Sequence, residues 1–316
     1  MDTPALSIIV PVYNEAACLR ELHSQITRAL ANANIAYEII AVDDGSTDET
    51  LPLLRQLAQN DARFRFISLK RNFGQTAALA AGFDNALGEY FVTLDGDLQN
   101  DPADIPALYK ACRRGGYDIV AGWRKKRRDP FFTKVLPSIL ANYLIRKITG
   151  VLVHDTGCSL KIIRRSAIAD LHLYGEMHRF IPALLHWTGS KIGEIEVNHR
   201  PRTQGKSKYG LEKLPRVLLD ILNIKFLISY STRPIQIFGK MGLYALLASV
   251  LSGLILIAMK LHGGVDMTGN PFLLLTVFLG FVGIQFITLG LLGEINIRTY
   301  HEATRCKIYR ISESSQ

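Results

Sequence analysis

Cysteine is scarce in this sequence, and several common motifs are missing from it. The four cysteines are scattered, with no Cys-x-x-Cys pair, which argues against a disulfide framework or a zinc site and fits a reducing cytosol. No Gly-x-Gly-x-x-Gly stretch is present, so we expect no dinucleotide cofactor. The stretch Gly205-Lys206-Ser207 is not a Walker loop, because that motif needs glycine where Arg200 stands. No basic leader precedes the first apolar segment, so we expect no signal peptide.

Charge is nearly absent from two long segments, residues 235–261 and 272–292. An apolar helix of roughly 20 residues spans the hydrocarbon core of a bilayer, and core helices of soluble proteins rarely reach that length without an internal charge. The high hydrophobic content, 48% of all residues, agrees with a partly membrane-embedded chain. We predict two transmembrane helices; two buried helices of a large soluble domain are the alternative.

The connector at residues 262–271 contains no Lys or Arg, whereas basic residues flank the two segments on their other sides. They are Lys225, Arg233, Arg298, Arg305, Lys307 and Arg310. The positive-inside rule therefore predicts a multi-pass protein of the inner (cytoplasmic) membrane with both termini and the main domain in the cytoplasm. The net charge of +9 suits membrane lipids and phosphate-bearing substrates, which we favour over nucleic acid as partners.

Apolar, β-branched runs alternate with helical patterns in the first half of the chain. Strands are predicted at residues 6–12, 37–42, 64–69, 90–94, 118–121 and 192–199. Helices are expected between them, one with a capping-box pattern at Ser46 and Glu49 and one that opens at Asp101-Pro102. Strands separated by single helices imply an α/β fold with a mainly parallel, doubly wound sheet, whose ligands bind at the carboxyl ends of the strands.

The domain organisation follows from these patterns. Residues 1–210 are predicted to form a cytoplasmic α/β domain, and residues 211–234 amphipathic helices at the membrane surface. Residues 235–293 hold the two transmembrane helices with their short external loop, and residues 294–316 a cytoplasmic tail. The arrangement places a soluble domain beside the bilayer.

Carboxylates follow two of the predicted strands. Asp43 and Asp44 come after the second strand, and Asp95-Gly96-Asp97 after the fourth. Two aspartates flanking one glycine repel each other when close, so a divalent cation is their natural neutraliser, and oxygen ligands favour Mg²⁺ or Mn²⁺ completed by a nucleotide diphosphate. For Asp43 and Asp44, a turn that caps the next helix is an equally open reading.

Basic runs lie at residues 124–128 and 200–208, beside a strand end and beside the predicted membrane-surface helices. Such runs are usually solvated faces. Here their positions favour contact with substrate phosphates or anionic headgroups.

Taken in order, six motifs resemble the polyisoprenyl-phosphate branch of the family 2 inverting glycosyltransferases, which have the GT-A fold. The motifs are Ile9-Val10-Pro11-Val12-Tyr13-Asn14-Glu15, Val42-Asp43-Asp44-Gly45-Ser46, Arg71-Asn72-Phe73-Gly74, Asp95-Gly96-Asp97-Leu98-Gln99, Gly205-Lys206-Ser207-Lys208-Tyr209 and Gly290-Leu291-Leu292-Gly293-Glu294. The branch includes dolichol-phosphate mannose synthase and bactoprenol glucosyltransferase. The segments Asp155-Thr156-Gly157-Cys158-Ser159-Leu160 and Arg179-Phe180-Ile181-Pro182 look most like undecaprenyl-phosphate aminoarabinose-type transferases of lipid A (lipopolysaccharide) modification.

The resemblance implies a role for individual residues. Residues expected at the nucleotide sugar are Pro11, Tyr13, Glu15, Asp43, Asp44, Asn72 and Asp95. Asp95 and Asp97 are expected to hold the metal, and Asp155 joins them as a catalytic candidate near the donor sugar or acceptor. Residues expected to grip the acceptor phosphate and the leaving diphosphate are Arg124, Arg127, Arg202 and Lys208. Cys158 stands where some relatives carry Asp or Ser, so we treat it as structural.

The predicted function is transfer of one sugar from a nucleotide sugar, a uridine diphosphate sugar by resemblance, to polyisoprenyl phosphate. A processive polysaccharide synthase is one alternative, but its Gln-x-x-Arg-Trp motif is absent, since Ala29 follows Gln25-Ile26-Thr27-Arg28. A noncatalytic membrane protein that binds nucleotide sugars is the other. The sugar, the exact lipid and a homo-oligomeric state stay open.

Overall fold

The computed structural model describes residues 3–125, residues 136–201 apart from 170, 172, 174 and 176, residues 235–303 apart from 265 and 267–269, and residues 311–315. The chain divides into two compact units, Met1–Leu222 with Lys307–Gln316, and Asn223–Cys306. The predicted membrane-surface helices at residues 211–234 lie outside the described residues.

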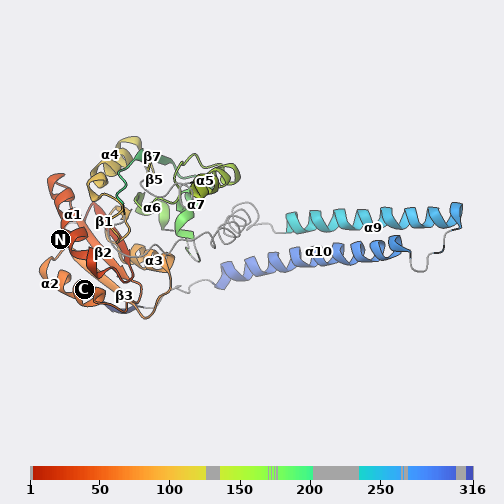
Figure 1. The fold of residues 1–316 in the computed structure, drawn as a ribbon, viewed down its shortest axis with the longest axis horizontal. Helices are drawn as coiled ribbons and strands as arrows, with labels where there is room; N and C mark the ends of the chain where they lie inside the picture. Colours follow the sequence, from red (N-terminus) through yellow and green to blue (C-terminus); the bar gives the residue numbers. More distant parts are fainter. Residues whose placement is uncertain are drawn as a thin grey trace. The chain divides into compact units, whose positions relative to one another are not determined.

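One eight-stranded sheet forms the centre of the first unit, with the strand order β7-β5-β6-β4-β1-β2-β3-β8 (Figure 1). Its strands are β1 (Leu6–Val12), β2 (Tyr37–Asp43), β3 (Phe64–Leu69), β4 (Tyr90–Thr93), β5 (Ile119–Trp123), β6 (Lys161–Arg164), β7 (Ile192–Glu196) and β8 (Ile311–Ser314). Within the described residues β6 and β8 run antiparallel to their neighbours, and the other strands run parallel to one another. The predicted α/β fold with a mainly parallel sheet is confirmed.

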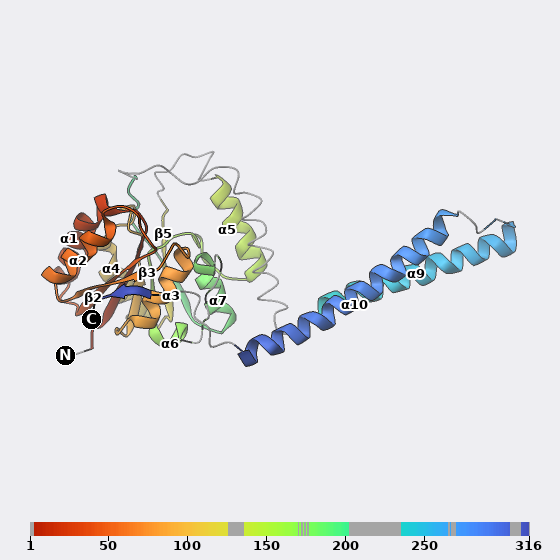
Figure 2. The same cartoon turned by 90° about the horizontal axis from the view of Figure 1, so that it is seen from below.

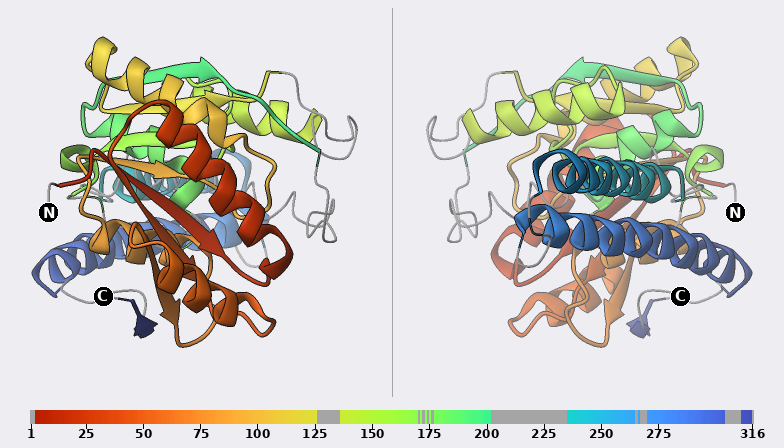
Figure 3. Two further views of the ribbon diagram at one scale, coloured as in Figure 1. Left: turned by 90° about the vertical axis from the view of Figure 1, so that its left-hand side faces the viewer. Right: turned by 90° about the vertical axis from the view of Figure 1, so that its right-hand side faces the viewer.

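Helices pack on both faces of this sheet (Figure 3). The helical elements of the first unit are α1 (Ala16–Asn32), α2 (Thr50–Asn60), α3 (Gln75–Asn85), η1 (Pro102–Asp104), α4 (Ile105–Gly115), α5 (Leu136–Thr149), α6 (Arg165–Ile168), η3 (Met177–Phe180) and α7 (Ile181–Trp187). Ile8 and Val10 of β1 share a buried cluster with the apolar side of α1. Ile9 points to the opposite face, where Gly82 of α3 comes so close that a Cβ there would lie 2.3 Å from Ile9 Cγ2.

The helix predicted to start with a capping box at Ser46 begins four residues later, and that prediction is wrong. The structure starts α2 at Thr50, whose backbone N–H is accepted by Asp48. The Ser46 hydroxyl instead accepts the backbone N–H of Asn14, 2.9 Å away in the turn after β1. A contact between two turns has displaced the local capping pattern.

The last described strand, β8, lies after both apolar helices in sequence but belongs to the sheet of the first unit. It pairs antiparallel with β3, with Ser68 opposite Glu313, and Figure 2 shows it as a short blue strand beside β3. Arg55 of α2 forms a two-point ion pair with Glu313 at 2.9 and 2.5 Å. The predicted tail therefore contributes a strand to the sheet, which its polar composition did not indicate.

The second unit is a hairpin of two long helices, α9 (Ile235–Gly263) and α10 (Pro271–Ala303). Each contains a stretch long and apolar enough to cross a membrane, Ile237–Gly263 and Pro271–Gly293. The helices meet at small residues: a Cβ on Gly242 would lie 2.7 Å from the carbonyl oxygen of Gly283. Close backbone approach of this kind is typical of helices packed in lipid, where association depends on van der Waals contact.

Candidate active site

The turns that follow β1, β2 and β4 meet at one edge of the sheet. The backbone N–H of Asp44 donates to the carbonyl of Val12 at 2.9 Å, and Thr47 N–H donates to the Asn14 side chain at 2.9 Å. A Cβ on Gly96 would lie 3.0 Å from Val12 Cγ1. Because these strands run parallel, their carboxyl ends bring Pro11, near the end of β1, and Tyr13 and Glu15, in the turn after it, to the same edge of the sheet as the other turns; their contact with a nucleotide sugar stays a prediction.

Both aspartates after β2 are already engaged by the protein. Asp43 accepts the Ser46 backbone N–H at 3.0 Å and the Ser68 hydroxyl at 2.9 Å. Asp44 accepts the backbone N–H groups of Phe73 and Gly74 at 2.7 and 2.9 Å. These bonds support the reading as a structural turn, while a ligand contact of either residue stays a prediction.

The loop between β3 and α3, which contains the predicted residue Asn72, packs tightly against the turn after β2. Gly45 has a φ of +71°, and a Cβ there would lie 2.5 Å from the backbone carbon of Arg71 and 2.7 Å from the nitrogen of Asn72. Glycine is therefore required at this position by both its conformation and the close approach of the second loop. Asn72 itself is exposed.

Asp95 and Asp97 flank Gly96 in the turn that follows β4, with Leu94 between the strand and Asp95. Asp95 is partly exposed and accepts the Gln75 side-chain amide at 2.8 Å, while Asp97 accepts the Gln99 side-chain amide at 2.8 Å. Burial, and next the negative charge of Asp97, raises the pKa of Asp95 above its ordinary value, although Ser159 donates a hydrogen bond that opposes the rise. A carboxylate whose charge is disfavoured by burial and by a second carboxylate nearby provides a suitable place for a cation.

Across from this pair, Asp155 and Arg124 form a buried ion pair. Arg124 Nε lies 2.7 Å from Asp155 Oδ2 and Nη2 lies 3.0 Å from Oδ1, and the side chains are 13% and 5% exposed. Burial by itself would lower the pKa of Arg124, but the hydrogen bonds that Arg124 donates to Asp155, together with the negative charge of Asp155, outweigh it and raise the pKa. The arginine predicted to grip phosphate is thus held in place by the aspartate predicted to be catalytic.

Lys161 is a further cation of this region that the sequence analysis did not single out. It starts β6 opposite Thr93 of β4, is only 4% exposed, and its Nζ donates to the carbonyl of Cys158. Burial lowers the pKa of Lys161, and the nearby charges of Asp155 and Asp95 oppose that shift. The signal in the sequence that could have pointed to Lys161 is a charged residue at the start of a short apolar strand.

Cys158 is fully buried, in agreement with a structural role. Burial raises the pKa of its thiol to about 11, so the reactive thiolate is scarce at neutral pH. Three other predicted residues, Arg127, Arg202 and Lys208, lie outside the described residues.

The donor set fits Mg²⁺ or Mn²⁺ when a nucleotide completes the coordination. Among the described residues no group of three or more His, Cys, Asp or Glu side chains converges as a metal cage. Mg²⁺ is typically held by one or two carboxylates together with substrate phosphates. Asp95 and Asp97 supply these two carboxylates, and each of their oxygens keeps a lone pair beyond the hydrogen bonds described.

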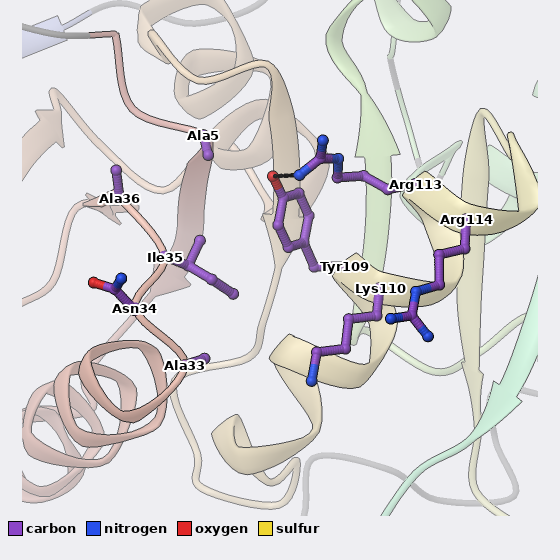
Figure 4. Close-up of a pocket in the computed structure, with 9 residues that line it drawn as sticks. All are labelled: Ala5, Ala33, Asn34, Ile35, Ala36, Tyr109, Lys110, Arg113 and Arg114. Carbon is purple, nitrogen blue, oxygen red and sulfur yellow. Dashed lines mark hydrogen bonds between the residues drawn. The ribbon is translucent and has the colours of Figure 1, made fainter.

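A cavity in the described part of the chain lies at the other end of the strands (Figure 4). It has a volume of about 570 Å³ and is lined by Ala5 and Ala36, which precede β1 and β2, and by Lys110, Arg113 and Arg114 of α4. Arg113 lies over the Tyr109 ring, 5.6 Å from its centre. No carboxylate lines this cavity, so it is separate from the site of Asp95 and Asp97.

The family model described as "Glycosyl transferase family 2" matches residues 7–171, which run from the second residue of β1 past the end of β6 and include the aspartates after β2 and β4. The chain belongs to this family. The predictions of a glycosyltransferase and of a family 2 member are therefore confirmed.

Two relatives match this glycosyltransferase over nearly its whole length. It is 44% identical to a dodecaprenyl-phosphate galacturonate synthase of Rhizobium johnstonii, over 94% of this chain and 88% of that protein. It is 37% identical to an undecaprenyl-phosphate 4-deoxy-4-formamido-L-arabinose transferase of Aeromonas hydrophila, over 95% of this chain and 90% of that protein. The predicted similarity to aminoarabinose-type transferases is confirmed.

The fold of this glycosyltransferase is also found in solved structures. Glucosyl-3-phosphoglycerate synthase of Mycobacterium tuberculosis, crystallised with Mn²⁺ and UDP-glucose, matches with a TM-score of 0.54 at 18% identity, over 72% of this chain and 81% of that one. At this identity the likeness establishes the fold, and the predicted GT-A architecture is confirmed.

Proposed function

We propose that this glycosyltransferase moves a single sugar from a nucleotide sugar to the phosphate of a polyprenyl lipid at the cytoplasmic face of the inner membrane. The observation that carries the proposal is an Asp-x-Asp turn at the carboxyl end of β4, in a chain that also has a hairpin of two apolar, membrane-length helices. The proposal is supported by the two relatives, whose names describe enzymes that act with dodecaprenyl phosphate and with undecaprenyl phosphate.

The pair of carboxylates after β4, Asp95 and Asp97, suits the departure of a nucleotide diphosphate. In this proposal Asp95 and Asp97 hold Mg²⁺ or Mn²⁺ together with the diphosphate, and the bound cation supplies charge neutralisation for the leaving group. The charges of Lys161 and Arg124 both act to lower the pKa of Asp95, so both residues lie close enough to influence this carboxylate. Loss of one such electrostatic contact costs on the order of 10²- to 10³-fold in rate.

The acceptor needs little activation. A phosphate monoester has its second pKa near 6, so the lipid phosphate is largely a dianion at neutral pH and attacks the anomeric carbon without a strong general base. Asp155, bound to Arg124 at two points, serves in this scheme to aim the guanidinium toward phosphate oxygens. Attack from the face opposite the leaving group inverts the anomeric configuration, and we assign Arg127, Arg202 and Lys208 to the acceptor phosphate.

The membrane topology in this proposal places both flanks of the hairpin in the cytoplasm. The pairing of β8 with β3 supports it, because residues after α10 and residues before α9 then belong to one folded unit on one side of the bilayer. The connector without Lys or Arg supports the opposite side for the hairpin tip.

The decisive experiment is a transfer assay with the purified full chain in detergent. Labelled UDP sugars, first UDP-galacturonate and UDP-4-deoxy-4-formamido-L-arabinose, are offered with undecaprenyl phosphate and Mg²⁺, Mn²⁺ or chelator. A chelator-sensitive lipid-linked monosaccharide supports the proposal and identifies the sugar. Binding of the nucleotide sugars without any lipid product across a broad panel would favour the noncatalytic alternative, and a product longer than one sugar would favour the processive one.

Asp97→Ala is expected to abolish transfer while leaving the protein folded, because it removes a carboxylate from the cation site. The matched control is Asp84→Ala, which removes an exposed carboxylate near the end of α3 and should transfer at the wild-type rate. Thermal unfolding in detergent verifies folding of both variants. Substantial turnover by Asp97→Ala would refute the metal assignment.

A further inference from the structure

Gln75 connects the loop after β3 to the Asp-x-Asp turn. It is the first residue of α3, and its side-chain amide nitrogen lies 2.8 Å from Asp95 Oδ1. Asp95 is therefore held by a side chain from a separate element while its own side chain remains partly exposed for a ligand.

The position of Gln75 is set by Asp44. The Asp44 carboxylate accepts the two backbone N–H groups just before Gln75, those of Phe73 and Gly74. Gly74, with a φ of +95°, is the residue from which α3 starts. The carboxylate after β2 thus fixes the start of α3, and the first side chain of α3 reaches the carboxylate after β4.

A purely local role, such as starting the helix, does not account for this geometry. The N-cap of α3 is Gly74, which has no side chain with which to cap the helix, and the hydrogen bond of the Gln75 side-chain amide goes outside the helix. The amide donates to a residue 20 positions away in sequence. A neutral donor is suited to this place, since it orients a carboxylate without neutralising the charge that attracts a cation.

We infer that Gln75 is a positioning residue for the divalent cation: its amide holds the Asp95 carboxylate in the orientation that binds the metal with the donor diphosphate. Partners of this kind, which hydrogen-bond a metal ligand without touching the metal, typically contribute 10- to 100-fold to metal affinity. The inference rests on the proposed function for its choice of cation and nucleotide.

The test measures Mn²⁺ binding to the full chain in detergent with UDP present, by electron paramagnetic resonance of free Mn²⁺, so no turnover is needed. Gln75→Met keeps the length of the side chain and removes the donor; its Mn²⁺ dissociation constant is expected to rise about 10- to 100-fold. Transfer at saturating Mn²⁺ should stay within about threefold of wild type, because the ligands themselves remain.

Two further variants separate positioning from general damage. Gln75→His keeps an N–H at a similar reach and is expected to restore most of the Mn²⁺ affinity. Gln56→Met removes another glutamine that bonds a side chain, Arg20 at 2.6 Å, but on the surface of α2, and should leave Mn²⁺ binding unchanged. Thermal unfolding of every variant shows whether the fold is kept.

The outcomes are distinct. An unchanged Mn²⁺ dissociation constant in a folded Gln75→Met protein overturns the inference, and so does an equal loss in Gln75→Met and Gln75→His. If wild type binds Mn²⁺ and UDP but makes no lipid product, the proposed function fails while the comparison of Gln75 variants still decides the positioning role. If folded wild type does not bind Mn²⁺ at all with UDP, both fail.

Discussion

The buried pair of Arg124 and Asp155 offers a direct test of how the site is held together. Replacing Asp155 by alanine leaves a guanidinium that is 13% exposed without the two oxygens that accept its hydrogen bonds. Removing one partner of a buried pair typically costs about 3–5 kcal/mol, because the remaining charge stays desolvated. For a domain of this size each kcal/mol lowers the melting temperature by about 2–4 °C, so Asp155→Ala should melt about 6–20 °C below wild type.

The matched variant removes both charges. In Arg124→Met with Asp155→Ala neither member of the ion pair is left without its partner, and replacing a buried ion pair by apolar groups is often close to neutral. We therefore expect the double variant to recover most of the stability that the single variant loses. Trp123, the neighbour of Arg124 and one of two tryptophans in the chain, reports local unfolding by its fluorescence.

The reasoning is refuted if the double variant melts as low as Asp155→Ala, because the loss would then come from packing or from the other contacts of Asp155. A drop of less than about 2 °C in the single variant, corresponding to below about 1 kcal/mol, would show that the pair is well solvated. Either result would also remove the support for Asp155 as the residue that aims Arg124.

Two further predictions concern pH and backbone geometry. Burial lowers the pKa of His178 from 6.5 to about 3. Between these two pH values His178 is protonated in the unfolded chain but not in the folded one. The free energy of unfolding should therefore fall as pH drops from 6.5 toward 3, by up to about 1.4 kcal/mol per pH unit. Urea denaturation between pH 7 and 4 should show a weaker pH dependence for His178→Asn, and equal slopes would contradict this. Gly45→Ala should lower the free energy of unfolding clearly more than Gly116→Ala does. Both glycines have a positive φ, but only at Gly45 would the added Cβ meet the backbone of Arg71. Gly116→Ala should lower the free energy of unfolding by about 1–2 kcal/mol, and equal losses for the two variants in thermal unfolding would exclude the clash.

Much of the fold could be predicted because its signals are local. The β-branched runs of β1, β2 and β3 are buried on both faces and read as strands without knowledge of their neighbours. The two apolar helices stand out by length and composition alone. In contrast, β6 and β8 have four residues each and mix charged or polar side chains with apolar ones, so their pairing depends on partners far away in sequence.

The candidate site was predicted in outline for the same reason. Asp95 and Asp97 follow a strand within a short motif, which sequence spacing reveals. The contacts of Gln75 with Asp95 and of Arg124 with Asp155 join residues 20 and 31 positions apart, and no periodic pattern indicates them. Which hydrogen bonds the carboxylates accept is decided by how the loops pack, and that information lies in the tertiary structure.

The place of β8 at the edge of the sheet also sets an order of events during synthesis. A ribosome that has completed β3 must still translate both membrane helices before Ile311 emerges, and the stretch from Ile235 to Ile311 alone takes roughly 4–15 s at 5–20 residues per second. Until then the edge of β3, with its unpaired backbone groups, is open to other strands. The nascent catalytic domain therefore completes its sheet only after both long helices have been translated.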